Sequence, residues 1–166
     1  MKQIITFYSD EKMYGVDIKL VNDINPNVDI MPVPLSDDFI RGLVNIRGQV
    51  VMIYDIGVVF AEKKSVINSA SHLIILKTAP NLLRCAEGDD YSEVINILED
   101  KPVGILVDMI GDVISVEESQ LDTSTDIINR KEWKCIKGVY KVNHQVIAVL
   151  DVPAVLSYKG TIPVNG

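Results

Sequence analysis

Short stretches in which apolar and polar residues alternate follow one another along most of this chain. Such alternation, with many Ile, Val, Tyr and Thr residues, predicts β-strands that each bury one face. The expected strands are Gln3–Ser9, Met13–Ile18, Val21–Ile24, Leu43–Ile46, Gln49–Asp55, His72–Lys77, Val94–Leu98, Val103–Met109, Asp112–Val116, Lys134–Val142 and Gln145–Leu150. No stretch predicts a long helix, so the pattern indicates an all-β protein with a few short helices.

The residues between these strands predict hairpins and helix caps. Arg47–Gly48 and Asn143–His144 fit hairpin turns, because Gly and Asn tolerate the positive φ angles that tight turns often need. Asp55 and Asp151 each precede an apolar segment, and an Asp at that place is a natural helix N-cap. Both hairpins are therefore expected to end in a short helix.

The remaining connections are rich in polar and turn-forming residues. Ser36 or Asp37 can cap a single helical turn over Asp38–Arg41. Thr78–Glu93 (TAPNLLRCAEGDDYSE) is acidic and turn-rich, so we expect a long surface loop there. Thr161–Gly166 is expected to be a frayed tail.

The chain contains an internal repeat. Gly42–Phe60 (GLVNIRGQVVMIYDIGVVF) aligns without a gap on Gly138–Leu156 (GVYKVNHQVIAVLDVPAVL), with five of nineteen positions identical. Gly15–Ile24 matches Gly104–Val113 in the same way. Two related β units are therefore expected, and five short strands can close as a small barrel. We expect one domain over residues 1–160, with the first repeat at about 15–60, the second at about 104–156, and a tail at 161–166.

Composition and charge narrow the possible functions. The chain has 166 residues, 48% hydrophobic content and a net charge of −7, which together predict a folded protein that does not bind nucleic acid. It has no apolar run long enough to span a membrane and no recognisable signal peptide, so we expect a soluble, cytoplasmic protein. Cys85 and Cys135 have no CxxC spacing and are expected to be reduced packing residues.

Residues that could support catalysis or metal binding have patterns that favour structural roles. His72 and His144 have no partner at metal-ligand spacing. Four aspartates recur at expected strand or helix ends, where capping explains them better than paired acid–base catalysis: Asp17, Asp55, Asp108 and Asp151. An acidic cluster that lacks the calcium-loop pattern falls in or beside the long loop: Glu87, Asp89, Asp90 and Glu93. We expect no enzymatic activity, no metal and no cofactor.

Arg47 is a lone cation at a hairpin tip within a highly apolar segment. One interpretation is a solvent-facing turn residue. The other is an arginine held by a carboxylate beside a binding groove, and its place in the chain makes Asp23 a candidate for that carboxylate. A partly buried pair of this kind has a geometric specificity that an exposed pair lacks.

The segment Phe39–Ile56 (FIRGLVNIRGQVVMIYDI) strongly resembles the CheW family of bacterial chemotaxis coupling proteins. Members of that family have a Phe-x-x-Gly-x-x-Asn-x-Arg-Gly run followed by apolar residues and Asp-Leu. Three further blocks agree, at Tyr14–Ile24, Val103–Val116 and Gln145–Leu156, so the match covers roughly Gln3–Leu156. The resemblance implies two tandem SH3-like five-stranded β-barrels packed on a shared core.

The resemblance also implies a role as a non-enzymatic scaffold. Such proteins couple the cytoplasmic tip of a chemoreceptor to the regulatory domain of a CheA-type histidine kinase. That kinase domain is itself similar to CheW, so the two can pack barrel to barrel in rings. The protein would be associated with membrane receptor arrays through these partners, without inserting into the membrane.

Site residues follow from the same resemblance. The positions that match the family's receptor-binding groove between the barrels are Val21, Asp23, Arg47 and Val113. Gly42 and Gly48 match glycines that the coupling function needs, which we interpret as tight turns of the backbone. Asp23 stands where the family usually has Glu, so its shorter side chain must reach further toward Arg47. The resemblance does not assign the kinase-binding residues.

Two other interpretations stay open. The same module can couple a different receptor–kinase pathway, such as one that steers surface motility. A small-molecule-binding double barrel, or an enzyme that uses Asp and His residues, would instead have an enclosed polar pocket between the halves. An adaptor would have an open groove there.

Overall fold

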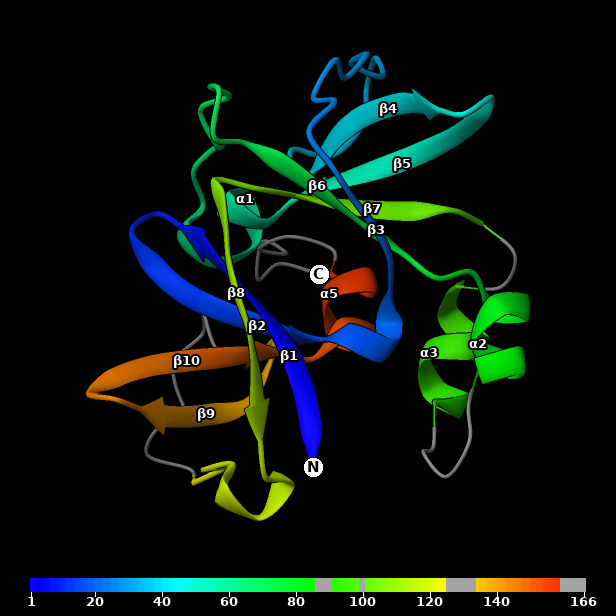
Figure 1. The fold of residues 1–166 in the computed structure, drawn as a ribbon. Helices are drawn as coiled ribbons and strands as arrows, with labels where there is room; N and C mark the ends of the chain where they lie inside the picture. The colour runs from blue at the N-terminus through cyan, green and yellow to red at the C-terminus, as the bar shows by residue number, and fades with distance from the viewer. Residues whose placement is uncertain (86–90, 99–100, 125–133, 159–166) are drawn as a thin grey trace, which may run out of the picture.

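Two five-stranded β-sheets form the body of the protein, with short helices between and beside them (Figure 1). The computed structural model describes residues 1–85, 91–98, 101–124 and 134–158. The strands are β1 (Lys2–Ser9), β2 (Lys12–Asp17), β3 (Val21–Asn25), β4 (Ile40–Ile46), β5 (Gln49–Asp55), β6 (His72–Leu76), β7 (Val103–Val107), β8 (Met109–Val116), β9 (Ile136–Val142) and β10 (Gln145–Leu150). The α-helices are α1 (Ile56–Ala61), α2 (Ala79–Cys85), α3 (Ser92–Leu98) and α5 (Val152–Leu156), and the 3-10 turns are η1 (Ile18–Leu20) and η2 (Glu118–Gln120).

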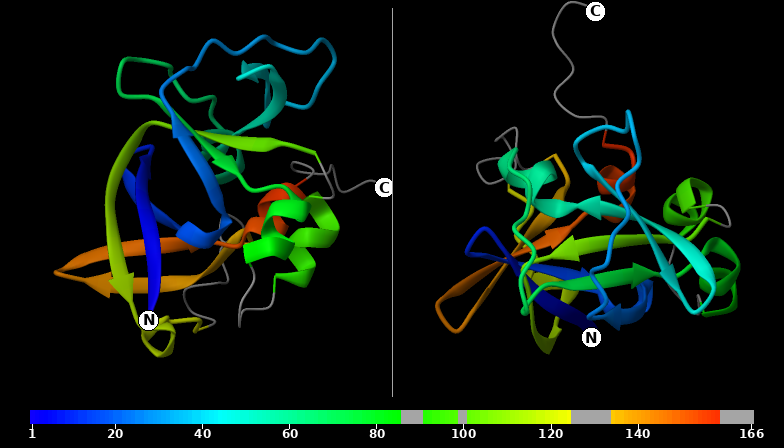
Figure 2. Two further views of the ribbon diagram at one scale, coloured as in Figure 1. Left: turned by 45° about the vertical axis from the view of Figure 1, so that its right-hand side comes forward. Right: turned by 90° about the horizontal axis from the view of Figure 1, so that it is seen from above.

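The chain passes between the two sheets twice. Sheet A has the order β8-β1-β2-β10-β9, and sheet B has the order β3-β6-β7-β5-β4. β3 follows β2 in the chain but pairs with β6 in sheet B, while β8 follows β7 but pairs with β1 in sheet A. Both crossing strands therefore connect the sheets, as the views in Figures 1 and 2 show.

The internal repeat of the sequence is also a repeat of the strand pairing. Ile53 pairs in parallel with Gly104 in sheet B, and Val149 pairs in parallel with Gly15 in sheet A. Ile53 aligns with Val149 in the repeat, and Gly104 with Gly15, so the two pairs are equivalent. The proposed extent of the domain and of its repeats stays a prediction, and the whole of the expected tail at 161–166 lies outside the described residues.

Apolar side chains form a core between the sheets as well as within each of them. Phe7, Tyr14 and Phe60 stack in the shared core, with ring centroids 5.7 and 4.8 Å apart. Smaller clusters fill sheet B, around Ile53, and sheet A, around Ile4. Because strand side chains alternate between faces, each sheet contributes one face to the shared core and the other to its own cluster.

The two predicted hairpin turns and the Asp55 and Asp151 caps are confirmed. Arg47 and Gly48 have φ angles of +53° and +82°, and Asn143 and His144 have +49° and +65°. Positive φ at both central residues is the type I′ geometry, whose twist matches that of the flanking strands. The Asp55 side chain accepts a hydrogen bond from Gly57 at the start of α1, and the Asp151 side chain caps α5 in the same way.

The expected loop and strand between residues 78 and 98 are wrong. The described part of this stretch contains α2 and α3, and Val94–Leu98 is helical. Val94 and Leu98 lie four residues apart and are both buried, which is the spacing of one helix face. A short run of β-branched residues fits a strand and a buried helix equally well, and packing in the shared core favours the helix.

Two smaller expectations are also wrong. No helical turn forms over Asp38–Arg41. A tight turn at residues 38–39 takes its place, in which the Ile40 amide donates to the Asp37 carbonyl at 3.0 Å. β4 begins at Ile40, because pairing with β5 satisfies more backbone groups than one helical turn would. The apolar strand expected over Val103–Met109 is interrupted at Asp108, where the chain passes from sheet B to sheet A.

Candidate functional site

The structure brings two of the four predicted groove residues together. Asp23 lies on β3, Arg47 lies in the β4–β5 turn, and Arg47 Nη2 is 3.9 Å from Asp23 Oδ2. Val21 lies on the same strand as Asp23. Val113 lies on β8, at the edge of sheet A, and is 50% exposed. Among the described residues, no hydrogen bond or ion pair joins Val113 to the other three.

The contact between Arg47 and Asp23 is loose. The Arg47 side chain is 82% exposed and the Asp23 side chain is 27% exposed. A pair near the distance limit with one partner in water contributes little to stability, because water screens the attraction and the long side chain loses entropy. The geometry therefore combines the two interpretations of Arg47, which faces solvent and also lies within reach of a carboxylate. The guanidinium is accessible to a partner.

Gly42 does not lie in a tight turn, as predicted, but within a strand. It lies inside β4 with a φ angle of +147°, and a Cβ there would be 2.1 Å from the Met31 carbonyl oxygen. Met31 and Leu43 exchange backbone hydrogen bonds of 2.7 and 2.9 Å at this point. The glycine therefore lets the segment before β4 lie against the strand. Gly48 does lie in a turn, and a Cβ there would meet open space.

The repeat contains the same crossing in sheet A. A Cβ on Gly138 would lie 2.7 Å from the Asp122 carbonyl oxygen. Asp122 and Val139 exchange backbone hydrogen bonds of 2.9 Å, as Met31 and Leu43 do in sheet B. Glycine therefore recurs at Gly42 and Gly138 because a backbone segment crosses the strand closely at both positions.

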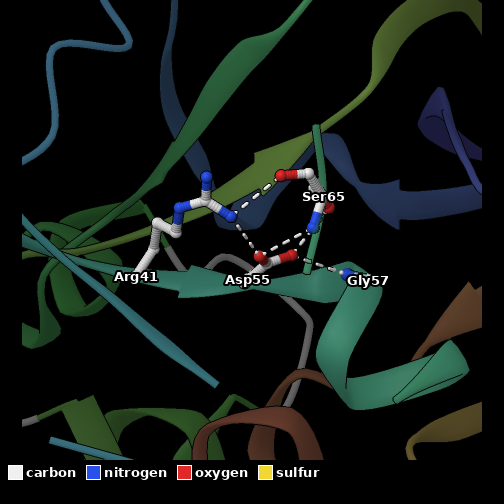
Figure 3. Close-up of polar contacts among 4 residues, drawn as sticks. All are labelled: Arg41, Asp55, Gly57 and Ser65. Atoms are coloured by element: carbon white, nitrogen blue, oxygen red, sulfur yellow. Dashed lines mark hydrogen bonds and ion pairs between the residues drawn. The ribbon is translucent and has the colours of Figure 1, made fainter. Parts of the chain in front are cut away.

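The sequence did not predict a buried polar network around Asp55 (Figure 3). Asp55 Oδ2 lies 2.9 Å from Arg41 Nη1 and 3.0 Å from the Ser65 amide. Asp55 Oδ1 accepts from the Gly57 amide at 2.9 Å and from Ser65 Oγ at 2.7 Å. Arg41 Nη1 also donates to the Ser65 carbonyl at 2.8 Å. The fully buried carboxylate therefore ties β4, the start of α1 and the segment after α1 together.

One signal for this network was present in the repeat. The position equivalent to Arg41 is Lys137, so both halves place a cation one residue before the repeated glycine. A cation that recurs at the start of a mostly apolar strand suggests a nearby carboxylate. Ser65 could not be found in this way, because it lies in a polar segment without a periodic pattern.

The other candidate chemical groups have structural surroundings. Asp17 is buried and accepts from the Tyr91 hydroxyl at 3.0 Å and from the Lys19 amide at 3.0 Å. Asp108 accepts from the Asp10 amide at 2.9 Å. His72 Nδ1 lies 2.7 Å from the Ala70 carbonyl oxygen. No group of three or more His, Cys, Asp or Glu residues in the described ranges could hold a metal ion.

Two more predictions concern cysteines and acidic residues. Burial raises the pKa of the Cys135 thiol from 9.0 to about 11, so the thiol is neutral at physiological pH, as a packing residue should be. The Cys85 side chain lies outside the described part of the structure. Of the expected acidic cluster, Glu93 lies in the first turn of α3, while Glu87, Asp89 and Asp90 lie outside the described residues.

A family comparison places this double-sheet architecture among known proteins. The model of the CheW-like domain matches residues 3–159. The chain belongs to the CheW-like family. The match spans both sheets, the two crossing strands and all four predicted groove positions.

Individual CheW proteins give the same result. Chemotaxis protein CheW of Treponema pallidum is 26% identical over 159 residues, which cover 95% of this chain and 83% of that protein. Chemotaxis protein CheW of Thermotoga maritima is 25% identical over 158 residues, which cover 93% and 87% of the two chains. More than nine-tenths of this CheW-like chain is therefore similar to more than four-fifths of each relative.

A solved structure shows the same fold. The scaffolding protein TtCheW from Thermoanaerobacter tengcongensis has a TM-score of 0.74 and 21% sequence identity, with coverage of 96% of this chain and 90% of that chain. The predicted fold of two SH3-like five-stranded barrels on a shared core is confirmed. No helix in the described residues is both long enough and apolar enough to cross a membrane.

Proposed function

We propose that this protein is a non-enzymatic adaptor that couples the cytoplasmic tip of a chemoreceptor to a CheA-type histidine kinase. The observation that supports this function best is the match of the CheW-like family over residues 3–159, in a chain that folds as a CheW double barrel. The names of the relatives as chemotaxis proteins and of TtCheW as a scaffolding protein point the same way. The adaptor acts in the cytoplasm, at receptor arrays.

The proposed receptor site lies around the two strands that cross between the barrels. Val21 and Asp23 lie on β3, Val113 lies on β8, and Arg47 reaches Asp23 from the β4–β5 turn. The half-exposed Val113 side chain and the accessible Arg47 guanidinium suit a transient signalling contact, which needs both apolar area and charge complementarity. Gly42 and Gly48 support this site through the β4–β5 hairpin, because Gly42 lets the preceding segment lie against β4 and Gly48 forms the turn.

The test measures the affinity of this protein for the cytoplasmic fragment of a chemoreceptor from the source organism, by isothermal titration calorimetry. Arg47→Asn removes the guanidinium and inserts the residue that holds the equivalent turn position at Asn143, so the positive φ is retained. We expect the receptor affinity to fall at least about tenfold, which corresponds to about 1.4 kcal/mol. Asn143→Gly, in the equivalent turn of sheet A, is the matched control and should leave the affinity unchanged. Wild-type affinity in Arg47→Asn would refute this receptor site.

A further inference from the structure

A pocket opens beside the small apolar cluster of sheet A, on the β1, β2 and β9 side. Its volume is about 300 Å³, which is at the lower end of the usual range for small-molecule sites. Its apolar lining includes four buried residues: Ile4, Leu20, Val149 and Leu150. Its polar lining consists of Lys2, Asp17, Glu118, Lys137 and Tyr140. None of the predicted receptor-site residues lines this space, which we call the sheet A pocket.

The repeat shows why sheet A has polar groups at this place. Ile4 pairs with Asp17 in sheet A, and Leu73 pairs with Leu106 in sheet B. The sequence repeat aligns Asp17 with Leu106. Leu106 and Leu73 are both fully buried in the apolar cluster of sheet B, whereas the cluster of sheet A includes Ile4 without Asp17. A carboxylate in sheet A thus stands where an apolar side chain fills sheet B.

Three of the four charged groups in the lining engage one another. Lys2 Nζ lies 2.7 Å from Glu118 Oε1 and 3.5 Å from Asp17 Oδ2. Asp17 also accepts from the Tyr91 hydroxyl and the Lys19 amide. Since this ammonium and the two carboxylates already form ion pairs, they are poor candidates for the groups that would recognise a ligand.

Two other donors in the lining have no acceptor in the part of the chain that the structure describes. The Tyr140 side chain is buried, with 3% of the residue exposed, yet its hydroxyl makes no hydrogen bond there. Every fully enclosed polar side-chain atom of the described residues has a partner, so this hydroxyl opens to the pocket that it lines. Lys137 is exposed and likewise makes no ion pair or hydrogen bond with the described residues.

A β-bulge brings these two donors to the same pocket. Residues three apart on a regular strand face opposite sides of the sheet. The pairing of β9 with β10 shifts register between Ile136 and Gly138, which leaves Lys137 as an extra residue. A bulge of this kind redirects a side chain. Lys137 and Tyr140 therefore both line the pocket, although they are three residues apart.

The equivalent bulge in sheet B shows what such a cation can hold. Arg41 is the extra residue of β4, as Lys137 is of β9. Arg41 Nη1 lies 2.9 Å from the carboxylate of Asp55. Asp151, the counterpart of Asp55, caps α5 and forms no ion pair with Lys137. The bulge cation of sheet B thus binds a carboxylate of its own chain, while that of sheet A stays available for one from outside.

We propose that the sheet A pocket binds a small monocarboxylate with an apolar chain. The carboxylate lies between the Lys137 ammonium and the Tyr140 hydroxyl, and the apolar chain lies against Ile4, Leu20 and Val149. Two donors without an acceptor require an acceptor from the ligand, and an ionised one gives the stronger hydrogen bonds. This binding goes beyond the adaptor function and does not depend on it.

The ligand class is tested with butanoate, hexanoate, 1-hexanol and hexylamine as probes. Binding to the isotope-labelled full chain is followed by heteronuclear NMR titration. We expect hexanoate to bind at millimolar concentration, about tenfold more tightly than butanoate, because it buries two more methylene groups. The alcohol and the amine have a similar apolar chain without the carboxylate and should bind at least about tenfold more weakly than hexanoate. Equal binding of hexanol or hexylamine, or no binding of hexanoate, would overturn the proposal.

Two variants test the proposed donors. Tyr140→Phe removes the hydroxyl and keeps the ring, and Lys137→Gln removes an exposed charge. Each should weaken hexanoate binding at least about tenfold, since a hydrogen bond to a charged group is among the strong ones. Urea denaturation should show unchanged stability in both variants, because neither donor has a partner in the described chain. A structural role alone would instead lower stability and leave the affinity unchanged.

The control is a second lysine of the same strand. Lys141 is also exposed and does not line the pocket, so Lys141→Gln makes the same change of charge nearby. It should leave hexanoate binding unchanged. Wild-type affinity in Tyr140→Phe or Lys137→Gln, or an equal loss in Lys141→Gln, would refute the site. Arg47→Asn should bind hexanoate as the wild type does, so failure of the receptor site and failure of this pocket are distinguishable.

Discussion

Asp55 and its repeat counterpart Asp151 differ in their surroundings, although both cap a helix. Asp55 is fully buried and has Arg41 and Ser65 as additional partners, whereas Asp151 is partly exposed and caps α5 through the Ala154 amide. Burial of an ion pair costs desolvation energy that the pair regains only when its hydrogen bonds are complete. The structure satisfies both Asp55 oxygens, so the loss of one partner should be costly.

Asp55→Asn tests this network at the residue scale. The amide cannot pair with the Arg41 guanidinium, which would be left in a partly buried position without its carboxylate. We expect the free energy of unfolding to fall by about 2–4 kcal/mol, measured by urea denaturation. Asp151→Asn changes a cap alone and should cost about 1 kcal/mol or less. Equal losses in the two variants would contradict the role of the Arg41 pair.

The buried thiol of Cys135 should make the free energy of unfolding depend on pH. Burial raises the pKa of its thiol from 9.0 to about 11, so the folded protein holds this proton at pH values where the unfolded chain has lost it. The corresponding stability is fully present below pH 9 and is lost as the pH rises toward 11.

The pH dependence can be assigned to the thiol by substitution. Burial also raises the pKa of Tyr54, so the wild type alone does not isolate Cys135. In Cys135→Ala, the fall in unfolding free energy between pH 9 and 11 should be smaller than in the wild type. Identical pH profiles from chemical denaturation would show that the thiol does not contribute.

At the scale of elements, Gly42 decides whether β4 can accept the segment before it. Gly42→Ala would place a Cβ 2.1 Å from the Met31 carbonyl oxygen and force both segments apart. We expect a loss of about 3 kcal/mol or more, from overpacking against backbone that cannot easily move. Thermal unfolding followed by circular dichroism measures this loss.

Gly48 is the comparison for Gly42. Its φ of +82° also favours glycine, but a Cβ there has open space and asparagine tolerates this region. Gly48→Asn should therefore cost less than about 1 kcal/mol. If Gly42→Ala were no more destabilising than Gly48→Asn, the crossing at Met31 would not be the reason for the glycine.

The elements that the sequence predicts correctly are those fixed by local chemistry. Alternation identifies the strands, and Gly48, Asn143, Asp55 and Asp151 identify turns and caps because each meets a local backbone need. α3 was mistaken for a strand because its β-branched residues fit either structure, and only burial of Val94 and Leu98 in the shared core selects the helix.

In the candidate site, too, contacts between distant segments were harder to predict than features set by local sequence. The contact between Asp23 and Arg47 was expected from the family resemblance, while its 3.9 Å distance and exposure required the structure. Arg41 and Ser65 were missed because they meet Asp55 from segments that no local pattern joins. The crossing of Met31 over Gly42 was also missed, because backbone contacts between distant segments leave no periodic signal.

At the scale of the whole molecule, the repeat predicts two related halves but not where the chain passes from one sheet to the other. β3 and β8 each leave the sheet of the preceding strand, and local sequence does not specify a strand's partner. The chain passes between the sheets twice, and one continuous core joins both barrels. Sheet B comes from one uninterrupted run of strands, β3 to β7, whereas sheet A combines the strands before and after that run. The proposed receptor site includes the two strands that follow these passages.

The central claim is that this molecule couples a receptor to a kinase. The most direct measurement is a pull-down from lysate of the source organism, with wild type and Arg47→Asn immobilised in parallel and bound proteins identified by mass spectrometry. We predict that the wild type recovers a chemoreceptor and a CheA-type kinase, while the variant recovers the kinase without the receptor. A receptor and kinase of another motility pathway would preserve the adaptor function and change the pathway. Recovery of neither partner by folded wild-type protein would contradict the account.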